Sequence, residues 1–130
     1  MDTDKTIKYW LAGAEDALIT AGHLFEKEHY HYALFFGHLV LEKVLKALVV
    51  RKTNQHADYT HNLVALAKAA GLVLSDGDFA FLTKATEFNL EARYPEDLEK
   101  LRKLYNKEFS TQALKNINSL SNIWRKTLTI

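Results

Sequence analysis

Apolar residues at the start of the chain recur at steps of three and four positions. The repeating set is Ile7, Trp10, Leu11, Ala14, Ala17, Leu18, Ala21, Leu24 and Phe25. This spacing places them on one face of a helix with about 3.6 residues per turn. The pattern predicts a helix from about Thr3 to Lys27. Asp2 and Asp4 stand where acidic side chains can cap its start by accepting from free amides, near the positive end of its dipole.

The next apolar segment, from Tyr32 to Val50, follows a polar interruption at residues 26–31. It is apolar around most of its helical circumference, and the exceptions are His38, Glu42, Lys43 and Lys46. A helix of this kind is buried on several sides. Because desolvated ions are costly, we expect Glu42 and Lys46 to pair at i and i+4 along an edge that reaches water or a partner.

Two shorter helices are expected in the middle of the chain. A polar connection at residues 51–58 precedes the first, which Thr60 caps and Gly71 ends. The second begins at a Ser75 cap and reaches about Glu91. Its inward residues are predicted to be Phe79, Leu82, Ala85 and Phe88.

The last quarter of the chain contains a break and one long amphipathic pattern. Because Pro95 disfavours helical angles at the residue before it, we place the break at Arg93-Tyr94-Pro95. A brief helical turn is expected around Leu98, Leu101 and Leu104. Ser110 or Thr111 then caps a last helix, whose apolar stripe is Leu114, Ile117, Leu120, Ile123 and Trp124. About five helices with short connections predict an all-α antiparallel up-and-down bundle, a single domain over residues 1–130.

Composition agrees with this fold and narrows the classes of function. A chain of 130 residues with 48% hydrophobic and 25% charged residues has the size and make-up of one globular domain. The absence of cysteine excludes disulfides, a thiol nucleophile and cysteine-ligated metal centres. A net charge of +1 gives no whole-molecule attraction to nucleic acid or membranes, and no apolar run approaches the ~20 residues that span a bilayer. We expect a cytoplasmic protein without a membrane partner.

All six histidines lie between His23 and His61, which raises the question of metal binding. Two Glu-x-x-His pairs, Glu26 with His29 and Glu28 with His31, have the spacing found in di-iron helical bundles. Those centres need such pairs on two separate helices, whereas both pairs here overlap in one polar interruption. We therefore expect no metal site and no cofactor.

Two residues are candidates for anion binding. His61 follows the expected cap Thr60, where its ring either donates to nearby backbone groups, protrudes, or meets a phosphate at the free amides of the helix start. Arg93 carries a permanently charged fork beside a proline. It either pairs with Glu91, Glu96 or Asp97 or binds an anion.

Several motifs occur in one order along the chain. They are Trp10 with Ala14, Asp16 and Leu18, then Tyr32 to Leu48 with its Glu-Lys-x-x-Lys-Ala-Leu end, then Thr60-His-Asn-Leu63, then Arg93-Tyr94-Pro95. Over about residues 7–128 this order resembles the HEPN domain family, the higher eukaryote and prokaryote nucleotide-binding domain. The resemblance implies a helical bundle that commonly dimerises. In prokaryotes such domains are often partners of a minimal nucleotidyltransferase in toxin–antitoxin pairs, and many are metal-independent ribonucleases.

The ribonuclease members carry an arginine that is followed a few residues later by a histidine. No histidine follows Arg93 here, and none lies beyond His61. The one literal match, Arg51 to His56, falls in the polar connection, which is the wrong place. Because histidine is the natural general acid and base near neutral pH, we expect no catalytic residue and lean against an enzyme.

The resemblance therefore implies a non-catalytic module that binds a nucleotide or RNA phosphate, docks a minimal nucleotidyltransferase, or does both. Its phosphate-binding residues would be Arg93, Tyr94, Lys46 and His61. One alternative is a ribonuclease with an atypical base, His61 or His38, and another is a purely structural dimerisation partner. A homodimer is expected because the second helix carries apolar residues beyond one buried stripe, namely Tyr32, Phe35, Phe36 and Leu39.

Overall fold

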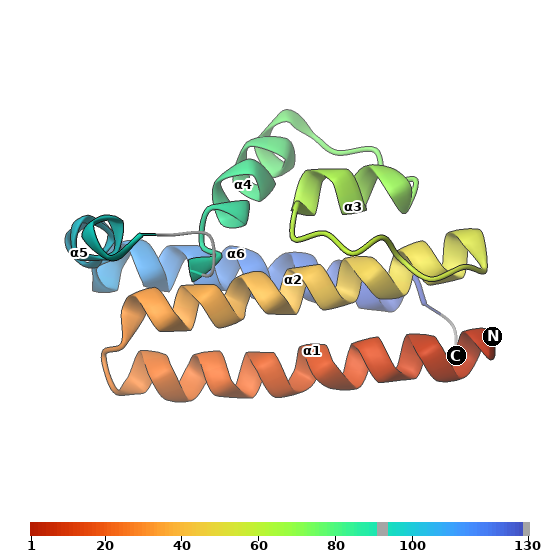
Figure 1. Ribbon diagram of the computed structural model, residues 1–130, viewed down its shortest axis with the longest axis horizontal. Helices are drawn as coiled ribbons and strands as arrows, with labels where there is room; N and C mark the ends of the chain where they lie inside the picture. The colour runs from red at the N-terminus through yellow and green to blue at the C-terminus, as the bar shows by residue number, and fades with distance from the viewer. Residues whose placement is uncertain (91–93, 129–130) are drawn as a thin grey trace.

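The computed structural model describes residues 1–90 and 94–128, and six helices account for most of them (Figure 1). They are α1 (Thr3–Glu26), α2 (Tyr30–Thr53), α3 (Leu63–Ala69), α4 (Asp76–Thr86), α5 (Pro95–Leu104) and α6 (Lys107–Lys126). The described residues contain no strand, which confirms the prediction of an all-α helical bundle. None of their helices is both long enough and apolar enough to cross a membrane. The single-domain assignment stays a prediction.

The helix α2 is the central element of the bundle and touches every other helix. It forms an antiparallel pair with α1, and α6 lies along another side of it (Figure 1). The chain returns through α3, α4 and α5 to the end of the molecule where α2 began (Figure 1). Between Val40 and Val50 every residue of α2 except Lys43 is buried, as the apolar circumference of this segment predicted.

The segment after Pro95 forms a complete helix, α5, instead of the brief turn that the sequence pattern predicted. Proline at the first helical position has a backbone angle that suits a helix start. Acidic Glu96 and Asp97 lie in the first turn, and basic Arg102 and Lys103 lie in the last turn. Both sets of charges interact favourably with the helix dipole and so stabilise the helix. No residue of α5 is fully buried, although Leu101 packs against the core.

Two of the predicted helix caps are confirmed. The Asp2 carboxylate accepts a hydrogen bond from the backbone amide of Lys5 at 3.1 Å, at the start of α1. The Ser75 hydroxyl accepts one from the amide of Asp78 at 3.1 Å, at the start of α4. Gly71 follows the end of α3 with a positive φ of 76°, as its assignment to a helix end predicted.

Two other caps were predicted wrongly. Asn62, not Thr60, caps α3 by accepting from the amide of Ala65 at 3.0 Å. The helix α6 begins at Lys107 under an Asn106 cap, so the Ser110 and Thr111 assignment is wrong as well. Asparagine is as strong a cap as serine or threonine, and the turn of the preceding loop decides which one is used.

Two apolar residues predicted to face inward are exposed. Leu82 and Ala85 of α4 are buried, and so are Ile117 and Trp124 of α6. Phe79 is 53% exposed and Ile123 is 57% exposed. Helical geometry places Phe79 about 120° around α4 from Ala85, and only one side of this short helix meets the core. The helix also ends at Thr86, earlier than predicted.

Candidate functional site

A cluster of polar side chains interrupts the apolar centre of α2. The Glu42 carboxylate accepts from Lys46 Nζ at 3.2 Å through Oε2, and its Oε1 accepts from His61 Nδ1 at 2.6 Å. His38 Nε2 donates to the backbone carbonyl of His61 at 3.0 Å. His38, Glu42 and Lys46 are all buried. We call these four residues the Glu42 cluster.

The cluster combines one face of α2 with the connection that precedes α3. His38, Glu42 and Lys46 follow one another at intervals of four residues, so they share a face of the helix. The connection runs back along α2 before α3 begins, which brings His61 over that face (Figure 1). Two contacts from His61, one by its ring and one by its carbonyl, tie the connection to the helix.

Two aromatic rings lie beside the cluster. Lys46 Nζ lies 5.1 Å from the centroid of the Trp10 ring and 5.6 Å from that of Tyr59. Lys43 Nζ lies 5.4 Å from the same Trp10 ring. A side chain at Gly13 would press on Lys43, because its Cβ would lie 3.1 Å from Lys43 Cδ. The ring of Trp10 is thus close to two ammonium groups, an arrangement that its π-electron face stabilises.

Glu42 and Lys46 were expected along an edge that reaches water or a partner, and the expectation is wrong for water, because each residue is only 5% exposed. Trp10 from α1 and the connection before α3 cover them. Their burial is tolerated because each charge has a partner within hydrogen-bond distance. The cluster reaches solvent through His61, whose side chain is 43% exposed.

The structure brings together two of the four residues predicted to bind phosphate. Lys46 and His61 contact opposite oxygens of the same carboxylate. Tyr94 is 71% exposed and precedes the first residue of α5. Arg93, together with its possible partner Glu91, lies outside the described residues, so the prediction for Arg93 stays a prediction.

Sequence reasoning did not identify Trp10 and Tyr59 as neighbours of the predicted site. The spacing of Glu42 and Lys46 indicated their pairing, but nothing local to α2 shows which distant rings cover them. The sequence offered one signal, the four-residue spacing of His38, Glu42 and Lys46 in a mostly apolar helix, and it indicates the polar face of α2 without identifying the rings beside it.

No group of three or more potential metal ligands occurs within residues 1–90 and 94–128. The two Glu-x-x-His pairs meet at the turn between α1 and α2. Glu28 and His29 belong to the turn itself, whereas His31 is in the first turn of α2. The expectation that the protein uses no metal or cofactor stays a prediction.

Comparison with protein families gives one match. The model of the HEPN domain matches residues 7–127, nearly the whole chain. Every residue of the Glu42 cluster and both neighbouring rings fall within this range. Neither a curated protein nor a solved structure matches the chain.

Proposed function

The chain belongs to the HEPN domain family, and on this basis we propose that it is a non-catalytic member that binds a nucleotide or RNA phosphate. The proposed contact surface is the solvent side of the Glu42 cluster, extended by Lys43 and Tyr59. Arg93 and Tyr94 are the further phosphate-binding residues of this proposal.

The observation that carries the proposal is the close association of basic groups with aromatic rings around His61. Lys43 and Lys46 flank Trp10, and Tyr59 lies beside His61 with a centroid separation of 6.3 Å. Tyr59 is 98% exposed, so its ring face is available to a base. Basic groups that follow a phosphate backbone, combined with rings that stack on bases, are the usual features of single-strand binding.

The members of the cluster have different roles in this proposal. Lys46 is buried against Glu42, so it holds the carboxylate and contributes positive potential from below the surface. Glu42 in turn orients the exposed His61 ring. Lys43 is half-buried and has no carboxylate within salt-bridge distance among the described residues, so its charge is available to a phosphate.

A non-catalytic role is favoured by the position of His38. It is fully buried and donates to a backbone carbonyl, which leaves it unsuited to a proton transfer on RNA. The alternative of a ribonuclease is tied to His61, because a carboxylate within hydrogen-bond distance can orient a histidine base. An assay for RNA cleavage therefore accompanies the binding experiment.

The binding experiment uses fluorescence anisotropy with a short labelled single-stranded RNA at several salt concentrations. Lys43→Gln loses one phosphate contact, so it should weaken RNA binding. The slope of the logarithm of the binding constant against the logarithm of the salt concentration should become about 0.7 less steep. Removing the ring in Tyr59→Ala should weaken binding about fivefold or more. The matched control is Lys115→Gln, an exposed lysine of α6 that should bind as the wild type does. Equal binding by all variants contradicts the proposed surface, and cleavage that disappears in His61→Ala contradicts the non-catalytic role.

Arg93 is tested separately. As a ligand residue, Arg93→Ala should weaken RNA binding about tenfold with little change in melting temperature, because charge-assisted hydrogen bonds are lost. Arg93→Lys should restore binding only in part, because an ammonium group does not form the paired hydrogen bonds of the guanidinium fork. Unchanged binding with lowered stability would instead assign Arg93 to a structural ion pair.

We further propose that the protein forms a homodimer and docks a minimal nucleotidyltransferase in a toxin–antitoxin pair of the prokaryotic cytoplasm. The support for the homodimer is the stripe of α2 that other helices cover least, formed by Tyr32, Phe35, Phe36 and Leu39. Membership of the HEPN family supports the proposal that the partner is a minimal nucleotidyltransferase. The neighbouring gene and co-purification with its product test the partner directly.

A further inference from the structure

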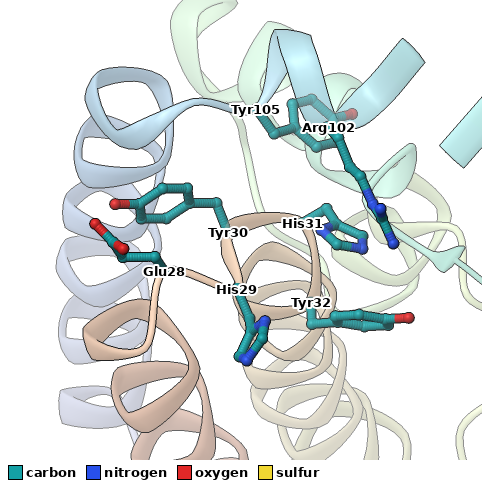
Figure 2. Close-up of a pocket in the computed structure, with 7 residues that line it drawn as sticks. All are labelled: Glu28, His29, Tyr30, His31, Tyr32, Arg102 and Tyr105. Atoms are coloured by element: carbon teal, nitrogen blue, oxygen red, sulfur yellow. The ribbon is translucent and has the colours of Figure 1, made fainter. Parts of the chain in front are cut away.

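A separate concave site lies at the end of the bundle where α1 turns into α2. A pocket of about 440 Å³ is lined there by residues 28–32 together with Arg102 and Tyr105 (Figure 2). Glu42 follows His31 by eleven positions, about 16 Å along α2, and His38, the first residue of the cluster on this helix, follows it by seven positions, about 10 Å. The pocket is therefore distinct from the Glu42 cluster. Its volume falls within the range of small-molecule binding sites.

A buried histidine forms part of the wall. His31 is only 8% exposed, and its Nε2 is buried without a hydrogen-bond partner among the described residues. Burial lowers the pKa of His31, and the neighbouring charges of Arg102 and His29 lower it further. The ring is accordingly neutral near pH 7, with a nitrogen that still has hydrogen-bonding capacity. Buried polar atoms are nearly always satisfied, so an unpartnered atom just beneath a pocket wall points to a ligand that reaches it when the side chains over it move aside.

A permanent positive charge lies beside this histidine. Figure 2 shows the guanidinium of Arg102 next to the His31 imidazole, with the Tyr32 ring close to both. Arg102 comes from the last turn of α5, whereas the two ring residues come from the first turn of α2. An arginine fork binds a phosphate or carboxylate group through two parallel hydrogen bonds.

Most of the remaining lining is aromatic, and His29 and Glu28 complete it, with the Glu28 carboxylate on the side away from Arg102 (Figure 2). The rings of His31 and Tyr32 lie 4.1 Å apart at an angle of 39°, and Tyr32 is 43% exposed. Tyr30 and Tyr105 add two further rings. Flat ring faces next to one cation suit a ligand that is itself flat and carries a negative charge at one end.

We propose that this pocket binds a small planar anion, namely an aromatic or heteroaromatic ring that carries a phosphate or a carboxylate. Arg102 receives the anionic group, His31 Nε2 forms a hydrogen bond with a polar atom of the ligand, and Tyr32 packs against the ring. A nucleoside monophosphate and an aromatic carboxylate share this chemistry. The site is independent of the proposed RNA surface, so either proposal can fail alone, whereas it shares Tyr32 with the proposed dimer stripe.

The test titrates the full chain with AMP, UMP, indole-3-acetate and inorganic phosphate, each followed by calorimetry and by NMR of the tyrosine rings. At least one ring-bearing anion should bind at millimolar concentration or below and shift the resonances of Tyr30, Tyr32 or Tyr105. Binding of the two mononucleotides alone identifies the source as a nucleoside phosphate, and binding of indole-3-acetate alone identifies it as an aromatic carboxylate. Binding of phosphate as tight as that of every ring-bearing probe, or no shift with any probe, overturns the proposal.

Variants locate the site. Arg102→Gln should weaken binding of the ring-bearing anion about tenfold, because a charge-assisted pair of hydrogen bonds is lost. His31→Phe keeps a ring but removes both nitrogens, and it should also weaken binding. The matched control is Lys103→Gln, the next residue of α5, which lies outside the pocket. Lys43→Gln should leave this binding unchanged while it weakens RNA binding. Equal loss in Arg102→Gln and Lys103→Gln would show a non-specific charge effect and overturn the assignment.

Discussion

His61 Nδ1 and Glu42 Oε1 lie 2.6 Å apart, in a hydrogen bond that joins the connection before α3 to the centre of α2. The carboxylate is buried and also holds Lys46, so one group satisfies two basic side chains from different parts of the chain. Hydrogen bonds to an ionised group are about twice as strong as neutral ones. This contact therefore fixes the loop that presents Tyr59 and His61 to solvent.

Replacing Glu42 by glutamine should destabilise the fold by about 3 kcal/mol, because the buried Lys46 ammonium loses its counter-charge. Lys46→Met in the same chain should recover most of this loss, since no unpaired ion then remains buried. Chemical denaturation measures both effects.

The Asp4–Arg51 ion pair is the matched control for Glu42. Its side chains are 64% and 39% exposed at a separation of 2.9 Å. Asp4→Asn should lower the free energy of unfolding by no more than about 1 kcal/mol, as for other exposed ion pairs. Equal costs for Glu42→Gln and Asp4→Asn would show that burial does not set the strength of the Glu42 contacts.

Stability should depend on pH through His31. Burial, Arg102 and His29 lower the pKa of His31 below its ordinary value of 6.5, so the unfolded state binds a proton more readily than the folded state. The contribution of the neutral His31 ring to the free energy of unfolding is therefore fully present above pH 6.5. It is lost as the pH falls through the lower pKa that His31 has in the folded state.

Urea denaturation at about pH 7.5 and about pH 5.5 measures this dependence. In His31→Phe the stability difference between the two conditions should be smaller than in the wild type. The control is His56→Gln, which changes an exposed histidine in the connection before α3. A wild-type difference that persists in His31→Phe would contradict the prediction.

Glu28 should be replaceable by glycine with a gain in stability. Glu28 has a φ of 64° at the end of α1, a left-handed conformation that side chains rarely adopt. The amide of Glu28 bonds to the carbonyl of Phe25 and that of His29 to the carbonyl of Leu24, the arrangement of a Schellman helix end. Relief of the left-handed strain should make Glu28→Gly more stable by about 0.5–1 kcal/mol.

The end of α3 provides an internal comparison for Glu28. There the same two bonds are made by Gly71 and Leu72, and Gly71 has a φ of 76°. Gly71→Ala should therefore lower the free energy of unfolding by about 1 kcal/mol or more, whereas Glu28→Gly should raise it. Thermal melts of both variants test the pair. A loss of stability in Glu28→Gly would show that its side chain is held by contacts worth more than the backbone strain.

Local patterns predicted where helices occur better than where they begin. The spacing of apolar residues around Ala14 was sufficient to predict α1. The apolar residues around most of the circumference of α2 were sufficient to predict that helix and its burial. The choice of Asn62 over Thr60 was not predictable, because both side chains can cap. Thr60 instead accepts a hydrogen bond from the amide of Asn62 at 3.1 Å, in the turn that leads into α3. Such a choice depends on the path of the loop, which no local pattern contains.

The candidate site was predictable to the same extent. A spacing of four residues implied that Glu42 and Lys46 are paired, but their burial depends on Trp10, which is 36 positions before Lys46 in the chain. The pocket beside His31 depends on Arg102, from a helix that the pattern predicted only as a turn. Contacts between distant segments are the part of a site that a single sequence does not specify.

The half-buried apolar stripe of α2, in which only Tyr32 is exposed, leads to the last prediction. Leu39 is half-buried against the core and faces partly outward with Phe35 and Phe36. If this stripe is the dimer interface, a buried charge within it should abolish association. Leu39→Glu should be monomeric by light scattering at concentrations where the wild type is dimeric, with its helical circular dichroism retained. Ile19→Glu is the control, because Ile19 is 50% exposed on α1 and lies outside the stripe. A monomeric wild type would show that this chain has no dimer interface at these concentrations. Dissociation by Ile19→Glu but not by Leu39→Glu would place the interface on α1, because Ile19 lies outside the stripe of α2.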